Sequence, residues 1–179
     1  MASAEDSDRV LHLVRGRLER ILSWPGGFAA QQARLIKLGK VDLEGVELDG
    51  PEDTKPTRGA QATVECLLTV DESCCNPSNN AHGGFLAWLI DHCSSLSLLA
   101  LSGPDERWIT SGVSTNLSVS YIGAAPVGTP LRIVTKVLQQ GRVTGLLETR
   151  ISHAETGKLL CFATHTKQDP QRSKSKAKL

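Results

Sequence analysis

The sequence has few aromatic residues and almost no net charge, and each scarcity argues against a class of function. Phenylalanine, tryptophan and tyrosine together make up 4% of the 179 residues. A surface on which nucleic-acid bases stack needs several aromatic rings, so this composition argues against one. The formal net charge of +1 provides no general attraction for a polyanion. We therefore expect no nucleic-acid partner.

The sequence also lacks a long apolar run without charges. The longest apolar stretch, Phe85–Leu101, carries Asp91 and His92 near its middle. A membrane span of this kind would bury a charge without a partner, so we expect no transmembrane segment. The N-terminal stretch Met1–Asp6 is acidic and has no apolar run, which is not typical of a secretory signal.

The cysteines predict neither a disulfide framework nor a metal site. They are odd in number and irregularly spaced, which favours reduced thiols in an intracellular compartment. Cys74 and Cys75 precede His82 without a second ligand pair at useful spacing, so we expect no metal and no other cofactor. A Cys-His nucleophile is also disfavoured, because nothing in the sequence predicts a lowered thiol pKa. The five cysteines are Cys66, Cys74, Cys75, Cys93 and Cys161.

Hydrophobic periodicity predicts one buried helix set among strands. Apolar residues occupy nearly every face of Gly83–Leu101, which indicates a helix that is buried on most sides. Such a helix needs a sheet curled around it. Alternation of apolar and polar residues supplies the strands. The expected strands are Ala33–Leu43 and Ala62–Val70 before the helix, and Val113–Tyr121, Leu131–Leu138, Val143–Ser152 and Lys158–Thr166 after it.

The two ends of the chain differ in character from its middle. Apolar residues at three- and four-residue steps predict a helix over Ser7–Ser23, begun by Asp6 or Ser7. The polar stretch Asp49–Gly59 contains two prolines and predicts a loop, and the polar, basic tail from Gln168 predicts disorder. We therefore divide the chain into a helical extension (1–28), one domain (29–168) and a tail (169–179).

Asp91 and the glycines at the start of its helix are the candidate chemical groups. A carboxylate on a buried helix costs several kcal/mol unless it is paired or opens onto a cavity. A structural alternative is that Ser94, Ser95 or the backbone satisfies it. Free N–H groups at the helix start, Gly83-Gly84, can bind a developing oxyanion. The alternative for this glycine pair is a tight turn.

The distance between these groups predicts a site made by two subunits. From Gly83 to Asp91 a helix rises by about 12 Å. One carbonyl cannot easily contact both groups in one chain, whereas a two-fold dimer would bring them together twice.

The sequence NPSNNAHGGFLAWLID, from Asn76 to Asp91, and the later SGVSTNLSVSY, from Ser111 to Tyr121, resemble the hotdog-fold thioesterases. The resemblance covers about Ala30–Gln168. It is strongest to the phenylacetyl-CoA thioesterases and the small eukaryotic acyl-CoA thioesterases. It implies an α+β hotdog fold, with an antiparallel sheet wrapped around a long central helix. It also implies hydrolysis of acyl-CoA at a site shared across a homodimer, with a dimer of dimers as the expected assembly.

The resemblance further implies a role for each candidate residue. Asp91 would act as general base on water or as nucleophile, with Ser114 beside it holding the water. The Gly83 N–H would polarise the thioester carbonyl, with Gly84 adjacent. Asn76 would orient the water or the carbonyl, and His82 would support the loop and the thiolate. The residues implied for coenzyme A are Tyr121, Gly123, Ala124, Gln140, Gly141, Arg142 and Lys167, with Arg142 and Lys167 as phosphate contacts.

Two other functions share this fold. A hotdog hydratase would need an acidic residue where Cys74 stands and a histidine nearer to Asn76 than His82 is. A non-catalytic acyl-CoA sensor or scaffold is the alternative from a different class, because a fold does not fix a function. Retention of Asp91 together with Asn76 and the glycine pair argues against the sensor.

The last three residues, Ala177-Lys178-Leu179, resemble the C-terminal tripeptide that directs proteins to peroxisomes. We therefore expect a peroxisomal import receptor as a partner and the peroxisome as the location, with the cytoplasm as the alternative.

Overall fold

The fold is an antiparallel sheet with a long helix against its inner face. The computed structural model describes residues 3–23, 26–103, 108 and 110–170. Its elements are α1 (Ala4–Leu22), α2 (Ala30–Ala33), β1 (Lys37–Leu48), β2 (Thr54–Thr69), a 3₁₀ turn (Glu72–Cys74), α3 (Gly83–Leu99), β3 (Val113–Tyr121), β4 (Pro130–Gln140), β5 (Thr144–His153) and β6 (Leu159–Gln168). The four strands after α3 lie within two residues of their expected bounds.

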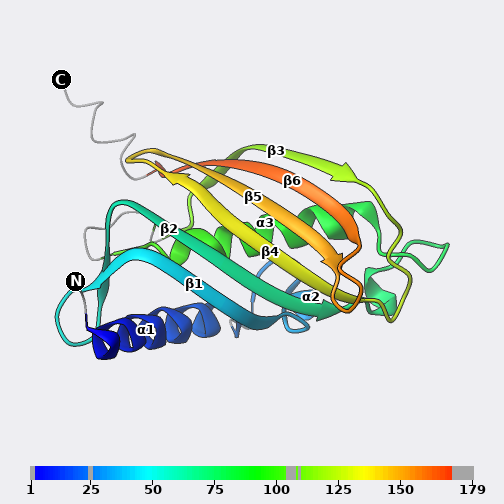
Figure 1. Cartoon of the computed structure of the whole chain (residues 1–179). Coiled ribbons are helices and arrows are strands. Elements are labelled where there is room, and N and C mark those ends of the chain that lie inside the picture. The colour runs from blue at the N-terminus through cyan, green and yellow to red at the C-terminus, as the bar shows by residue number, and fades with distance from the viewer. Residues whose placement is uncertain (1–2, 24–25, 104–107, 109, 171–179) are drawn as a thin grey trace, which may run out of the picture.

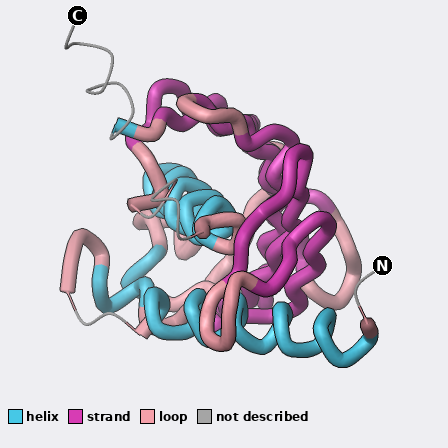
Figure 2. Tube along the Cα trace, turned by 90° about the vertical axis from the view of Figure 1, so that its left-hand side faces the viewer, coloured by secondary structure: helices cyan, strands magenta, loops and turns pink. Residues whose placement is uncertain are grey.

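The six strands pair in the order β1-β2-β4-β5-β6-β3, and every neighbouring pair is antiparallel. Figure 1 shows α3 behind the sheet, and Figure 2 shows the sheet bending around that helix. The expected wrap of antiparallel strands around a central helix is therefore confirmed. Because β1 and β3 are the outer strands, β3 has one edge without a neighbouring strand among the residues that the structure describes.

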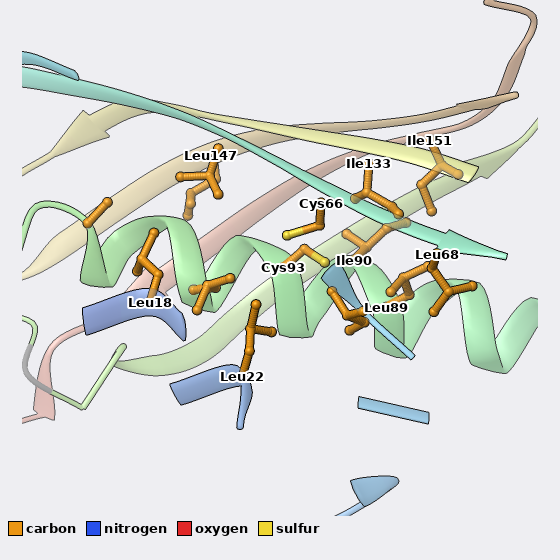
Figure 3. Close-up of a cluster of buried hydrophobic side chains, with 14 of the residues drawn as sticks. Leu18, Leu22, Cys66, Leu68, Leu89, Ile90, Cys93, Ile133, Leu147 and Ile151 are labelled. Atoms are coloured by element: carbon orange, nitrogen blue, oxygen red, sulfur yellow. The ribbon is translucent and has the colours of Figure 1, made fainter. Parts of the chain in front are cut away.

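The all-round apolar character of α3 is explained by cover on two sides. Ile133 and Leu147 on the sheet point toward α3 from one side, and Leu18 of α1 approaches it from the other (Figure 3). Leu89 and Ile90 of α3 are both 0% exposed. Among the helices that the structure describes, none is long and apolar enough to cross a membrane.

The N-terminal helix begins earlier than expected. It starts at Ala4 and not at Ser7, because Ser3 and Asp6 form a capping box in which each side chain bonds the other residue's backbone N–H. Its buried stripe packs on the domain, so the helix is part of the core rather than a separate extension. The buried residues are Val10, Val14, Leu18 and Leu22.

Arg17 ties α1 to the end of α3 and to the β1–β2 turn. Its guanidinium group donates to the main-chain oxygens of Leu99 and Ser102, at 3.3 and 2.9 Å, and to Asp53 Oδ1 at 3.0 Å. Leu99 O also accepts from the Ser102 N–H and hydroxyl, so Arg17 adds a charged donor to carbonyls at and just beyond the end of the helix, where the helix's own hydrogen bonds stop. Burial lowers the pKa of Arg17, and the Asp53 carboxylate opposes that effect.

The loop expected at Asp49–Gly59 is mostly strand. β2 begins at Thr54, and Leu48 pairs with Thr54 directly after a short turn. Pro56 is tolerated because this part of β2 has only β1 as a partner, since pairing with β4 starts at Thr63. The prediction of a loop was wrong because the prolines in a segment do not reveal which strands pair with it.

The tail begins later than expected. Gln168 lies in β6, and Asp169 is 1% exposed, with its carboxylate accepting from the Trp108 N–H at 3.1 Å. The Asp169 N–H also donates to Val143 O at 2.8 Å. Disorder from Gln168 was therefore wrong for these two residues, and the expectation for 171–179 lies outside the described residues.

Replacing Arg17 with alanine should lower the free energy of unfolding by about 1–3 kcal/mol, because buried carbonyls and Asp53 would lose a charged donor. Chemical denaturation measures this change. The matched control is Arg20→Ala on the same helix, since Arg20 is exposed and should change stability by less than about 0.5 kcal/mol. Equal effects for the two variants would contradict the anchoring role of Arg17.

Candidate functional site

The loop before α3 is held by the side chain of Asn76. Its Oδ1 accepts from the backbone N–H groups of Ser78 and Asn80, at 2.9 and 3.3 Å. Asn79 has φ +56°, and asparagine tolerates this left-handed conformation better than most other residues with side chains. With Oδ1 engaged inside the loop, the Nδ2 group of Asn76 is the part of this side chain left to donate to a ligand.

His82 and the glycine pair form the start of α3. His82 Nδ1 accepts from the Gly84 N–H at 2.9 Å, which caps the helix. The Gly84 N–H is therefore already used by the His82 side chain. Within the described part of the chain no hydrogen-bond partner is found for the Gly83 N–H, so of the two glycines only Gly83 offers a free donor.

Tyr121, at the end of β3, lies against this helix start. Its hydroxyl donates to Gly83 O at 2.9 Å, and its ring lies 3.5 Å from where a Cβ on Gly83 would be. The side chain is more than half exposed, which leaves it accessible to a ligand. Gly123 and Ala124 continue from it, and a Cβ on Gly123 would lie only 3.0 Å from Leu160.

Asp91 lies in a polar cluster that opens to solvent. The Ser114 hydroxyl donates to Asp91 Oδ1 at 3.2 Å, and Lys167 Nζ lies 3.5 Å from the same oxygen. The Asp91 side chain is 44% exposed. The Ser94 hydroxyl lies 3.0 Å from the main-chain oxygen of Asp91 and Ser95 accepts from Lys167, so neither serine donates to the carboxylate. The carboxylate therefore contacts Ser114 and Lys167, and not Ser94 or Ser95 as the structural alternative would require.

His165 is a residue of this cluster that the sequence reasoning missed. Its Nε2 lies 2.9 Å from Ser114 Oγ and its Nδ1 lies 2.6 Å from Ser94 Oγ. Burial lowers the pKa of His165 to about 4, with a further contribution from the Lys167 charge, while Asp91 opposes the shift. The imidazole is therefore neutral near pH 7.

A neutral His165 has a single N–H, and this restricts the hydrogen-bond directions. Ser114 has one hydroxyl proton, which it gives to Asp91 Oδ1. The contact between Ser114 and His165 Nε2 is then satisfied when Nε2 carries the proton and donates it to Ser114 Oγ. His165 Nδ1 then has no proton and accepts from the Ser94 hydroxyl, so Ser94 holds the ring and the ring directs the Ser114 hydroxyl toward Asp91.

Lys167 lies inside the protein and not at the surface. Its side chain is 4% exposed, and its ammonium group donates to Ser95 Oγ. The expectation that Lys167 contacts a coenzyme phosphate is therefore wrong, because β6 turns this side chain inward together with His165. Burial lowers the pKa of Lys167, and Asp91 acts in the opposite direction.

Three of the cysteines have the raised pKa of an unreactive thiol. Burial raises the pKa of Cys74 and of Cys161. A contact with Cys66 and burial raise the pKa of Cys93 well above its usual value, so its thiol stays protonated. Figure 3 shows both sulfur atoms between α3 and β2. Among the described residues, all five cysteines are free, and no group of three or more His, Cys, Asp or Glu side chains could hold a metal ion.

The second segment expected to bind coenzyme A lies at the β4–β5 turn. Gly141 O accepts from the Trp108 indole N–H at 3.1 Å, which fixes this turn, and Arg142 is exposed beside it. Gln140, which precedes the turn, pairs with Gly145. The turn is at the end of the sheet where Gln168 pairs with Val113.

The candidate residues thus form two groups at opposite ends of one sheet. Strand β3 runs from Ser114, beside Asp91, to Tyr121, beside Gly83. The first group also contains His165, Lys167 and the β4–β5 turn, and the second also contains Asn76, His82, Gly123 and Ala124. One chain therefore does not bring the oxyanion donor and the carboxylate together.

Comparisons with known proteins agree on one family of relatives. The model of the thioesterase superfamily matches residues 78–160. Human acyl-coenzyme A thioesterase 13 is 32% identical over 108 residues, which are 60% of this chain and 74% of that protein. A hypothetical thioesterase from Streptococcus pneumoniae, solved with coenzyme A, is 31% identical with a TM-score of 0.53, over 59% of this chain and 77% of that one. Zebra fish thioesterase superfamily member 2, at 24% identity, shares the fold with a TM-score of 0.63, over 87% and 94% of the two chains.

The low pKa of His165 predicts a loss of stability on acidification. The folded pKa of about 4 lies below the ordinary value of 6.5, so the neutral His165 side chain contributes to the free energy of unfolding above pH 6.5. That contribution is lost as the pH falls toward 4. The loss should reach at most about 3 kcal/mol. Denaturation of wild type and His165→Gln between pH 7.5 and pH 4 should therefore give stabilities that converge at low pH.

The control for this measurement is His12→Gln, which changes an exposed histidine on α1 and should leave the pH dependence of stability as in wild type. Parallel curves for wild type and His165→Gln would show that His165 is not the buried neutral group described above.

Proposed function

Because this chain belongs to the thioesterase superfamily, we propose that it hydrolyses acyl-CoA thioesters to a carboxylic acid and coenzyme A. The relatives support this substrate class: the human relative is named an acyl-coenzyme A thioesterase, and the Streptococcus neighbour was solved with coenzyme A. The observation that carries the proposal is the half-exposed Asp91 carboxylate, held on one oxygen by Ser114 and Lys167.

The geometry of Asp91 supports attack on the carbonyl. Both of its close contacts fall on Oδ1, so Oδ2 is the oxygen available to take a proton from water or to attack the thioester carbon directly. The Gly83 N–H stabilises the oxyanion that forms on the carbonyl oxygen. If Asp91 takes a proton from water, the hydroxide adds to the carbonyl carbon; if Asp91 attacks directly, water afterwards hydrolyses the mixed anhydride. In both cases the carbon–sulfur bond breaks, coenzyme A leaves as the thiolate, and water supplies the proton that the thiolate takes up. A thioester is activated enough for this arrangement to act without a serine nucleophile.

We place the catalytic site between two copies of the chain. Gly83 of one copy and Asp91 of the other would act on one bond, since about 12 Å of helix separates them within a chain. The exposed edge strand β3 supports such an assembly, because an unpaired edge can pair with a second copy. Val113 and Tyr121 on β3, and Ile122 after it, are large apolar side chains that are more than half exposed.

The same assembly would unite the two coenzyme segments. Tyr121, Gly123 and Ala124 of the copy that supplies Gly83 would lie beside Gln140, Gly141 and Arg142 of the copy that supplies Asp91. Arg142 remains the phosphate contact, because it is exposed. A dimer of dimers is the further assembly proposed.

The hydratase alternative has less support. His82 uses Nδ1 to cap α3, and Cys74, at the position where a hydratase would carry an acid, is buried with a raised pKa that burial causes.

We expect Asp91→Asn to hydrolyse acyl-CoA at least about 100-fold more slowly than wild type while binding it normally, because the amide cannot accept a proton. Asn76→Ala should also be slow. A 1:1 mixture of the two variants, unfolded and reassembled together, should regain about a quarter of wild-type activity, since half of randomly formed dimers carry one intact site of two. Loss of thioester absorbance is the readout.

Each part of that experiment has its own control. Mixing either variant with itself should restore nothing. Full wild-type activity in Asp91→Asn would remove the carboxylate from the mechanism, and no recovery in the mixture would place the whole site in one chain. Binding of acyl-CoA by wild type without turnover would favour the sensor.

We also propose that the chain is peroxisomal, from Ala177-Lys178-Leu179, which lie outside the described residues. A fluorescent protein fused to the N-terminus of the full chain should co-localise with a peroxisomal marker, and removing Leu179 should leave it diffuse. Identical distributions with and without Leu179 would reject this location.

A further inference from the structure

Lys167 brings a positive charge to Asp91 from inside the protein. β6 sends alternate side chains inward, and Cys161, Ala163, His165 and Lys167 are all buried on this face. The Lys167 ammonium lies 3.5 Å from Asp91 Oδ1 and donates to Ser95 Oγ. Burying an ammonium group is costly unless it is paired, so its environment is built to hold the charge.

We propose that Lys167 is a positioning residue that fixes the Asp91 carboxylate and balances its charge. This inference rests on the proposed function. Lys167 and Ser114 together hold Oδ1, which directs Oδ2 toward the reacting bond. Lys167 approaches from β6 and Ser114 from β3, so the carboxylate is restrained from two directions.

In the described chain, Lys167 is the group that provides a positive charge beside the Asp91 carboxylate. Asp91 on α3 and His165 on β6 are the ionisable groups that act on Lys167 in the described chain, while Ser95 and Ser114 are uncharged. His165 is neutral near pH 7, since burial lowers its pKa to about 4. The carboxylate therefore depends on Lys167 for a positive neighbour.

A second consequence concerns alkaline pH. Burial lowers the pKa of Lys167, so the ammonium group loses its proton at a pH below the usual range of lysine. The pair with Asp91 is lost with that proton. The rate of the wild-type enzyme should therefore fall on the alkaline side, and arginine at this position should move that fall to higher pH, because a guanidinium group stays charged.

The test compares Lys167→Met and Lys167→Gln with Lys167→Arg, using steady-state hydrolysis of acyl-CoA from pH 6 to pH 10 by the full-length protein. Methionine keeps much of the side-chain length, and glutamine keeps a donor for Ser95, but neither carries charge. We expect kcat to fall by about 10- to 100-fold in both, with KM within about threefold of wild type. We expect Lys167→Arg to recover part of kcat and to retain it at higher pH.

The comparison variant is Arg142→Met, which removes an exposed cation proposed to contact the coenzyme. Arg142→Met should raise KM with little change in kcat. The same pattern in Lys167→Gln would mean that Lys167 contacts the coenzyme and does not position Asp91. Thermal melting checks that each variant is folded. Wild-type kcat and an unchanged pH profile in either uncharged variant that folds would overturn the inference while leaving hydrolysis intact. If neither uncharged variant folds, the test compares wild type with Lys167→Arg. A rate that falls at the same alkaline pH in both proteins would overturn the inference. No turnover by wild type would overturn the proposed function itself, and this inference with it.

Discussion

The rigid length of α3 between Gly83 and Asp91 determines how this protein can act. The helix start carries the free N–H, and a carboxylate stands about 12 Å further along the same axis. Because a helix buried on two sides cannot bend to bring them together, we propose that a second copy of the chain supplies one of the two groups. Strand β3 has the same arrangement, because Ser114 at one end lies beside the carboxylate and Tyr121 at the other end lies beside the helix start.

The remainder of the fold keeps that helix in position. The sheet covers α3 on one side and α1 covers it on the other, while Arg17 ties the end of α3 to α1 and to the β1–β2 turn. The polar cluster is similarly placed by β6, which turns His165 and Lys167 toward Asp91. The Asp91 carboxylate is thus held by groups from two strands, β3 and β6, and only one of its oxygens is committed.

Periodicity and turn residues were enough to predict the central helix and the strands after it, because burial on a helix and alternation on a strand leave direct patterns in sequence. Contacts between distant segments leave weaker patterns. The roles of His165 and Lys167 depend on β6 lying beside β3 and α3, although two polar residues at inward positions of a strand were a usable signal. The hydrogen bond from the Gly84 N–H to the His82 side chain is a local contact that was not expected from the glycine pair alone.

The most direct measurement is a structure of the protein with an acyl-CoA analogue in which a methylene group replaces the thioester sulfur. The account predicts that the analogue's carbonyl oxygen lies about 3 Å from the Gly83 nitrogen of one copy. It also predicts that Asp91 Oδ2 of the other copy, directly or through one water, faces the carbonyl carbon. A carbonyl that meets Gly83 and Asp91 of the same chain, or that meets neither, would contradict the two-copy site.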